Sequence, residues 1–228
     1  MRSSDRGSSW SKWMGALVAL ALVAAPAGLS AQMGGMSRDA RLSVNPRVGV
    51  TVPGSNLSDL YKVAPSAGVG LGYWMTPRFG VVVNADVDFL NGKNTADAGI
   101  NGGVPDMRLW EFTGGLAARL TPPATSRWDV TAQVGAGFTQ MDTDSSPFFL
   151  LNQSSDSFSQ GYFSAQGGLQ VGYDIQPGVD LWVGGRANLI LTKEEDTMAF
   201  APLSDNVAAA GFDKAWTFPV RLGLRVRF

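Results

Sequence analysis

The chain has 228 residues, of which 45% are apolar and only 16% are charged, with 28 glycines and neither cysteine nor histidine. The length suits one domain, and the low charge is unusual for a soluble domain, where charged residues make up about 25%. Without cysteine or histidine, disulfides, thiolate metal sites and the commonest general base are excluded, so we expect no metal site and no cofactor. The net charge of -1 gives no electrostatic reason to bind nucleic acid.

The first segment has the pattern of a secretory signal peptide. Basic residues from Arg2 to Lys12 precede an apolar run over residues 14–29, and small residues follow it as far as Ala31. The run is shorter than the roughly 18 to 20 apolar residues that a membrane-spanning helix needs. We therefore expect export and cleavage after Ala31. A retained N-terminal anchor is the alternative.

Apolar and polar residues then alternate in eight successive segments. Only a β-strand places residues i and i+2 on the same face. In the clearest case, aromatic and aliphatic residues from Trp216 to Phe228 share one face, while Arg221, Arg225 and Arg227 lie on the other. The eight apolar rows cover residues 42–52, 67–73, 79–89, 110–120, 128–138, 163–175, 179–191 and 216–228.

The connections between these segments alternate in length. The short ones contain proline or glycine and cover residues 76–78, 121–127 and 176–178. The long, polar ones cover residues 53–66, 90–107, 139–161 and 193–214. This pattern predicts an all-β fold, an eight-stranded antiparallel up-and-down transmembrane β-barrel with short periplasmic turns and four long extracellular loops.

The prediction divides the chain into three parts. Residues 1–31 are the cleaved signal peptide, residues 32–40 are a short periplasmic N-terminal segment, and residues 41–228 form the outer-membrane β-barrel domain. Both termini of the mature chain are expected in the periplasm of a Gram-negative-type bacterium. Because a closed barrel has no free strand edge, we expect a monomer.

The aromatic residues distinguish a membrane barrel from a soluble, ligand-binding barrel, which would turn its apolar rows inward. The rings gather at both ends of the rows around an aliphatic band, as on membrane-facing surfaces. The predicted girdles are Phe89, Trp110, Phe112, Phe138, Phe163, Trp216 and Phe218 at the loop end, and Tyr73, Phe79, Trp128, Tyr173 and Phe228 at the turn end. The lysines Lys62, Lys93, Lys193 and Lys214 all fall in the long loops.

The polar faces are expected to line the lumen, where charges of both signs nearly balance. An isolated charge in a narrow lumen is costly to desolvate, so we expect pairing rather than an open ion pathway. The predicted lumen charge network is Arg41, Arg47, Asp86, Asp88, Glu111, Arg119, Asp129, Asp174, Asp180, Arg186, Arg221, Arg225 and Arg227.

Two groups are expected within this network. The group near the turn end forms a salt-bridged floor of Arg119, Asp129, Asp174, Asp180, Arg225 and Arg227. Higher in the barrel, Arg47, Arg186 and Arg221 are expected to face Asp86 and Glu111. Inward-pointing glycines leave room for the guanidinium groups, namely Gly68, Gly70, Gly72, Gly135 and Gly137.

With these features the chain resembles the small outer-membrane β-barrel family, in particular the OmpA transmembrane domain and OmpX. The most specific part of the resemblance is the C-terminal row Val220, Leu222, Leu224, Val226 and Phe228. In that family such a row, ending in phenylalanine, resembles the signal that the barrel-assembly machinery reads. The resemblance also implies outer-membrane lipid and lipopolysaccharide as surroundings, and a lumen that is closed or weakly conducting.

The favoured function is a non-enzymatic, structural or surface-interaction role through the loops, which offer sites for an extracellular ligand. A porin-like passive channel for small solutes or ions, passing Arg186 and Arg221, is the alternative. A hydrolase of envelope lipids is a distant third, because the resembling enzymes rely on a histidine that this chain lacks. The loop residues of interest are Asp142, Asp144 and Asp156, the apolar residues 148–151, and the acidic residues 194–196.

Overall fold

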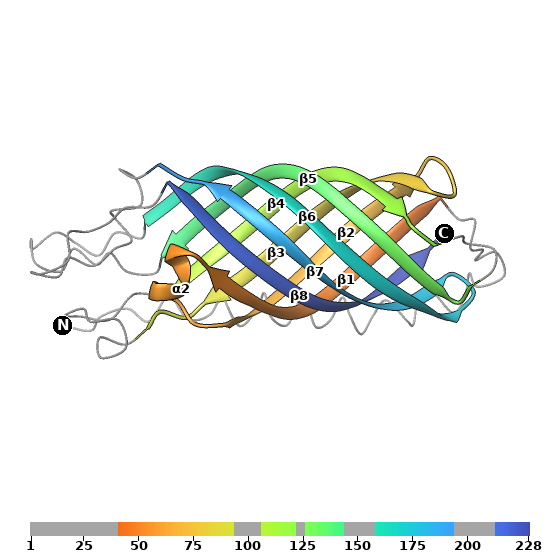
Figure 1. Cartoon of the computed structure of the whole chain (residues 1–228), viewed down its shortest axis with the longest axis horizontal. Helices are drawn as coiled ribbons and strands as arrows, with labels where there is room; N and C mark the ends of the chain where they lie inside the picture. Colours follow the sequence, from red (N-terminus) through yellow and green to blue (C-terminus); the bar gives the residue numbers. More distant parts are fainter. Residues whose placement is uncertain (1–40, 94–105, 122–125, 144–157, 194–212) are drawn as a thin grey trace, which may run out of the picture.

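The computed structural model describes residues 41–93, 106–121, 126–143, 158–193 and 213–228. In this part of the chain, eight strands pair in chain order and close into an antiparallel barrel (Figure 1). The strands are β1 (Leu42–Gly54), β2 (Ala64–Trp74), β3 (Phe79–Leu90), β4 (Met107–Arg119), β5 (Trp128–Thr143), β6 (Phe158–Gln176), β7 (Val179–Leu191) and β8 (Lys214–Arg227). The predicted fold class is therefore confirmed.

The barrel closes where the first strand pairs with the last. The β1–β8 ladder runs from the pair Ser43 and Arg227 to the pair Gly54 and Trp216. At its turn end, Phe228 donates its backbone N–H to the carbonyl oxygen of Leu42, 2.9 Å away. Closure leaves every strand paired on both sides, which is the condition for a sheet to cross a membrane.

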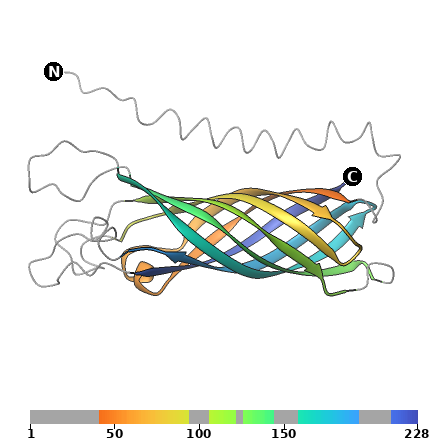
Figure 2. The same ribbon diagram turned by 90° about the horizontal axis from the view of Figure 1, so that it is seen from above.

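The two ends of the barrel differ as the alternating connections predict. The turns at 76–78 and 176–178 and the C-terminus lie at one end, and the strand ends that lead into the long connections lie at the other (Figure 2). In the turn between β6 and β7, Gly178 adopts a φ of 79°, which glycine tolerates without strain. We call these the turn end and the loop end.

Some strands extend further into the long connections than the apolar alternation indicates. Residues 139–143 and 158–161, expected as loop, continue β5 and β6 up to the pair Thr143 and Phe158. Lys214, also expected in a loop, is the first residue of β8 and pairs with Leu191. Backbone hydrogen bonds hold these extensions together. Such bonds form whether or not apolar and polar side chains alternate, so the sequence pattern does not report them.

The first long connection contains a short helix that the sequence pattern does not predict. Helix α2 (Asn56–Leu60) follows Ser55, whose φ of 52° turns the chain back over the loop end. Tyr61 then forms an isolated antiparallel bridge with Gly92. Among the residues that the structure describes, no helix has the length and apolar character needed to cross a membrane.

The rings of the predicted girdles lie on the outer face of the strands. At the turn end, Trp128 and Tyr173 make an edge-to-face contact with ring centroids 5.0 Å apart. At the loop end, Phe138 and Phe163 are cross-strand partners with perpendicular rings, and Trp216 stacks on Phe218. Most of the girdle rings are exposed on the barrel surface, while Trp110 and Trp216 are half-buried.

Several sequence-based expectations concern residues outside the described ranges. These are the signal peptide at 1–31, the N-terminal segment at 32–40, Asp144, Asp156, and the loop residues 148–151 and 194–196. Asp142 is described, and its carboxylate accepts a hydrogen bond from Gln140 Nε2 at 3.0 Å.

Candidate functional site

The centre of the lumen holds a cluster of three arginines around one carboxylate. Asp86 on β3 accepts hydrogen bonds from Arg47 Nε and Nη2, each at 2.8 Å, in the bidentate geometry typical of this pair. Arg186 Nη2 donates to Asp86 Oδ2 at 2.8 Å, and Arg221 Nη1 lies 2.8 Å from Oδ1. All four side chains are buried, so this central cluster fills the lumen from several directions.

Polar residues extend the central cluster across the barrel. Arg221 Nη2 donates to Asp88 at 2.8 Å. Arg186 Nη1 donates to Gln166, whose amide in turn donates to Thr113 at 2.7 Å. These side chains come from β3, β4, β6, β7 and β8, and therefore join strands that are distant in the sheet.

Glu111 has a different partner from the expected one. Its carboxylate accepts hydrogen bonds from the side-chain amide of Asn188 at 2.8 and 3.0 Å. The arginines that it was expected to face are drawn instead to Asp86 and Asp88. The sequence shows that all of these side chains point inward, but the height of each in a tilted barrel depends on the stagger between strands.

Inward-facing glycines on β2 leave the space that the central cluster occupies. A Cβ atom added to Gly68 would overlap the carboxylate of Asp86, and one added to Gly70 would lie 2.8 Å from Arg47 Nη1. On the opposite wall, a Cβ added to Gly168 would collide with the side chain of Arg186. Side chains at these positions would therefore displace the arginines or the carboxylate.

The six residues of the predicted floor lie together at the turn end. Arg225 Nη1 lies 2.6 Å from Asp129 Oδ2 and 3.4 Å from Asp180 Oδ2. Arg227 also contacts Asp129, at 3.2 Å, and is bonded to Asp180. The remaining two members join at longer range, because Arg119 lies 3.7 Å from Asp129 and Asp174 lies 3.8 Å from Arg227.

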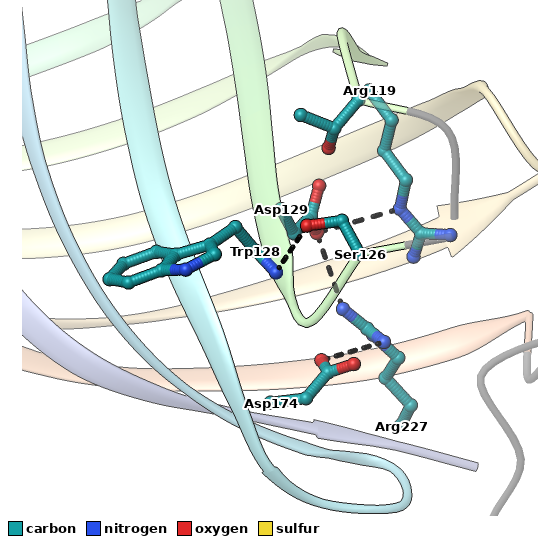
Figure 3. Close-up of a pocket in the computed structure, with 7 residues that line it drawn as sticks. Arg119, Ser126, Trp128, Asp129, Asp174 and Arg227 are labelled. Carbon is teal, nitrogen blue, oxygen red and sulfur yellow. Dashed lines mark hydrogen bonds and ion pairs between the residues drawn. The ribbon is translucent and has the colours of Figure 1, made fainter. Parts of the chain in front are cut away.

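A pocket opens beside this floor, at the turn between β4 and β5 (Figure 3). Arg119, Asp129, Asp174 and Arg227 point toward one another, while the indole ring of Trp128 points away from them. The complete lining is Arg119, Thr121, Ser126, Trp128, Asp129, Asp174 and Arg227.

Arg41 does not join the lumen network, which corrects the prediction. It lies just before β1, its side chain is exposed, and its carbonyl oxygen accepts a hydrogen bond from the backbone N–H of Trp74 at 2.7 Å. The alternation of side chains between the two faces of β1 would turn Arg41 inward, but this alternation holds only within the strand. At this end the wall of the barrel has already ended.

The loop end of the lumen is closed by apolar side chains, a feature that the sequence analysis missed. Leu57 and Tyr61, from the first long connection, pack down into the barrel mouth and form one cluster with residues of seven strands, β2 to β8. Burial, and secondarily the charge of Asp106, raises the pKa of Tyr61 above its ordinary value. This apolar cap consists of Leu57, Tyr61, Ala64, Leu90, Met107, Leu109, Met141, Tyr162, Ile190 and Ala215.

A signal for the cap does exist in the sequence. Leu90, Leu109, Met141 and Ile190 are apolar residues at positions whose parity turns them into the lumen. Each lies near the loop end of its strand, where it departs from the polar inward pattern. Their exposed fractions are all 0%, so together with α2 they exclude solvent from this end.

Comparison with known proteins identifies the family. The family model described as the outer membrane protein beta-barrel domain matches residues 15–228. The chain belongs to this family. Membership places the protein in the outer membrane of Gram-negative bacteria. A sequence search of curated proteins finds no match.

Solved structures of small barrels resemble this outer-membrane barrel at low sequence identity. Neisserial surface protein A (NspA) matches with a TM-score of 0.55 and 16% identity over 82% of this chain and 97% of its own. OprG of Pseudomonas aeruginosa matches with a TM-score of 0.48 and 13% identity over 85% and 98% of the two chains. Ail, the attachment invasion locus protein of Yersinia pestis, gives 0.47 and 14% over 82% and 99%. The NspA match supports the same fold.

Proposed function

We propose that this protein is a non-enzymatic outer-membrane barrel with a closed lumen, which acts at the cell surface through its long loops. The turns and both termini face the periplasm, and the loop end faces the exterior. The proposal rests on two groups of side chains that block the lumen. The central cluster around Asp86 blocks the middle, and the apolar cap blocks the loop end.

The energetics of the central cluster support a closed resting state. Leaving one member of a buried ion pair without its partner typically costs about 3–5 kcal/mol. Each 1.4 kcal/mol changes an equilibrium constant about tenfold. A conformation with Asp86 released from its arginines would therefore make up about 1% of molecules or less. The apolar cap would also have to open before ions could pass.

The available side chains also support a role without catalysis. The chain contains no histidine or cysteine, and the lumen carboxylates Asp86, Asp129 and Asp180 are occupied by arginines. Among the described residues, no group of three or more acidic side chains is placed to hold a metal ion. These three carboxylates are therefore poorly placed to act as a general base for a nucleophile.

Lipopolysaccharide is the partner that the loop end suits best. Lys62, Lys193 and Lys214 are exposed there, and Lys214 forms a long ion pair, at 3.9 Å, with exposed Asp213. Cations at the outer rim of the barrel lie where the phosphate groups of lipopolysaccharide are concentrated. Lysine binds phosphate as a point charge, so this attraction should weaken as salt increases.

Solute uptake by proteoliposomes tests the closed lumen. Liposomes that contain the folded protein should swell in arabinose or glycine no faster than liposomes without protein. Swelling that falls with increasing solute size would contradict closure and would favour the passive channel.

Thermal unfolding in maltoside micelles tests the surface role. Added lipopolysaccharide should raise the unfolding midpoint of the wild type more than that of the double variant Lys62→Gln/Lys193→Gln. The matched control is Arg78→Gln/Arg127→Gln, which removes two exposed cations from the turn end. An equal rise in all three proteins would reject the loop-end lysines as the binding residues.

A further inference from the structure

Three exposed arginines lie on the rim of the barrel at the turn end. Each is the residue immediately before a strand, β1, β3 or β5, and the first side chain of each of these strands is exposed on the outer face. We call these residues the arginine collar, which consists of Arg41, Arg78 and Arg127. Because a strand rises about 3.3 Å per residue, each arginine begins one step beyond the lipid-facing surface.

The backbone of the collar is fixed by the neighbouring strands. The carbonyl oxygen of Arg78 accepts a hydrogen bond from the N–H of Arg119 at 2.8 Å, and that of Arg127 accepts one from Asp174 at 2.9 Å. Arg41 is held in the same way by the last residue of β2. The collar therefore presents long, flexible side chains from rigid points of the rim, and such side chains can extend toward charged groups in the interface.

Exposed charge at the turn end has one sign among the side chains that the structure describes. The carboxylates there belong to the floor, where they contact the floor arginines and their side chains are at most 15% exposed. The loop end differs, because Asp59, Asp106 and Asp213 are exposed among its lysines. The collar therefore gives the turn end a positive rim that exposed carboxylates do not offset.

The depth of the collar indicates the anion that it meets. The turn-end girdle lies beside it, and girdle aromatics lie at the level of lipid headgroups, where phosphate is the common anion. Arg127 Nη1 donates to the hydroxyl of the girdle residue Tyr173 at 3.4 Å, which holds this guanidinium group at the same level. Guanidinium groups bind phosphate oxygens in a bidentate manner, and basic residues near a membrane surface favour anionic lipids.

We propose that the arginine collar binds the phosphate groups of anionic phospholipids in the leaflet at the turn end. Exposed side chains can meet these headgroups in the plane of the leaflet, without a pocket in the protein. The binding goes beyond the proposed function and does not depend on it. Only the assignment of this leaflet to the periplasmic side rests on the orientation given there.

Electron spin resonance of labelled lipids at the protein surface tests the proposal. The full chain is folded in phosphatidylcholine vesicles and probed with phosphatidylglycerol and phosphatidylcholine that carry the same acyl-chain label. Both leaflets then have the same composition, so the orientation of the barrel does not affect the result. The variant is Arg41→Gln/Arg78→Gln, and the matched control is Lys62→Gln/Lys193→Gln, which removes two exposed cations from the loop end.

We expect the wild type to associate with phosphatidylglycerol more strongly than with phosphatidylcholine. A basic residue near a membrane surface contributes about a fivefold gain in affinity for anionic lipid, so loss of two collar arginines should bring the ratio of the two association constants toward one. The lysine variant should lose less, because exposed carboxylates already offset charge at the loop end. In the wild type, about 1 M salt should also lower the ratio.

Two results would overturn the proposal. An unchanged ratio in Arg41→Gln/Arg78→Gln would leave the collar to a soluble anionic partner. An equal loss in the arginine and lysine variants would mean that net charge alone sets the lipid preference.

Discussion

Arg186 on β7 and Asp86 on β3 lie on opposite walls of the barrel, yet Arg186 Nη2 is only 2.8 Å from Asp86 Oδ2. In a closed ring of eight strands, β3 and β7 are as far apart as two strands can be. One ion pair therefore bridges the full width of the lumen. Arg47 and Arg221 approach the same carboxylate, so Asp86 is the centre of the central cluster that blocks the middle of the lumen.

Asp86→Asn should destabilise the barrel strongly. The amide keeps the shape of the carboxylate but leaves three buried guanidinium groups without their shared anion. We expect the free energy of unfolding to fall by about 3–5 kcal/mol, the cost of an uncompensated buried charge. Equilibrium urea unfolding in lipid vesicles measures this change.

Asp213→Ala is the control for loss of a carboxylate. Asp213 pairs with Lys214 at 3.9 Å, and its side chain is 73% exposed. A pair of this kind contributes less than about 1 kcal/mol. If Asp86→Asn changes stability no more than Asp213→Ala does, the central cluster does not stabilise the barrel.

Gly68→Ala should disturb the central cluster from the neighbouring wall. The added methyl group would overlap Asp86 Oδ1, so the carboxylate must move away from Arg47. Overpacking of this kind typically costs about 1–3 kcal/mol. Vesicle unfolding of Gly68→Ala, compared with the wild type, gives the value.

Gly167→Ala provides a matched substitution on the lipid-facing surface. A Cβ there meets nothing within 4 Å, so we expect unchanged stability or a gain of up to about 1 kcal/mol from reduced chain entropy. Equal losses for the two alanine variants would mean that the effect comes from the glycine backbone rather than from Asp86.

The proposed orientation predicts which end reacts with an external reagent. Because the chain has no cysteine, single substitutions give an unambiguous signal. A membrane-impermeant maleimide should label Asp59→Cys, on α2, in intact cells. It should label Arg78→Cys, in the turn between β2 and β3, only after the outer membrane is permeabilised. The reverse pattern would invert the orientation.

Phe228→Ser should separate assembly from stability. The ring of Phe228 is 44% exposed, and its backbone bonds to Leu42 do not depend on the side chain. We expect refolding of the purified protein to be almost unchanged, while cells accumulate less folded barrel, as the family resemblance implies. Equal loss in both settings would indicate a purely structural role for the ring.

Much of the fold follows from the sequence because each strand carries its own pattern. Alternation between a lipid face and a lumen face identifies all eight strands, and the turn residues identify the end with short connections. The same parity is enough to place Arg47, Asp86 and Arg221 in the lumen. These properties depend only on neighbouring residues along one strand.

The features that the sequence does not reveal depend on several strands at once. Whether Arg186 reaches Asp86 or Glu111 is set by the stagger between strands, which alternation does not report. The apolar cap requires α2 to fold back, so that Leu57 meets residues from distant strands. The prediction for Arg41 is wrong because parity cannot show where the barrel wall ends.

Single-channel recording in planar bilayers tests the closed lumen most directly. The protein should first show the heat-dependent gel shift of a folded barrel. We predict no resolvable openings for the wild type, and brief openings when Arg186→Ala removes the central bridge and Leu57→Ala weakens the cap. Steady ion currents through the folded wild type, altered by Arg186→Ala, would contradict the account and identify the lumen as a channel.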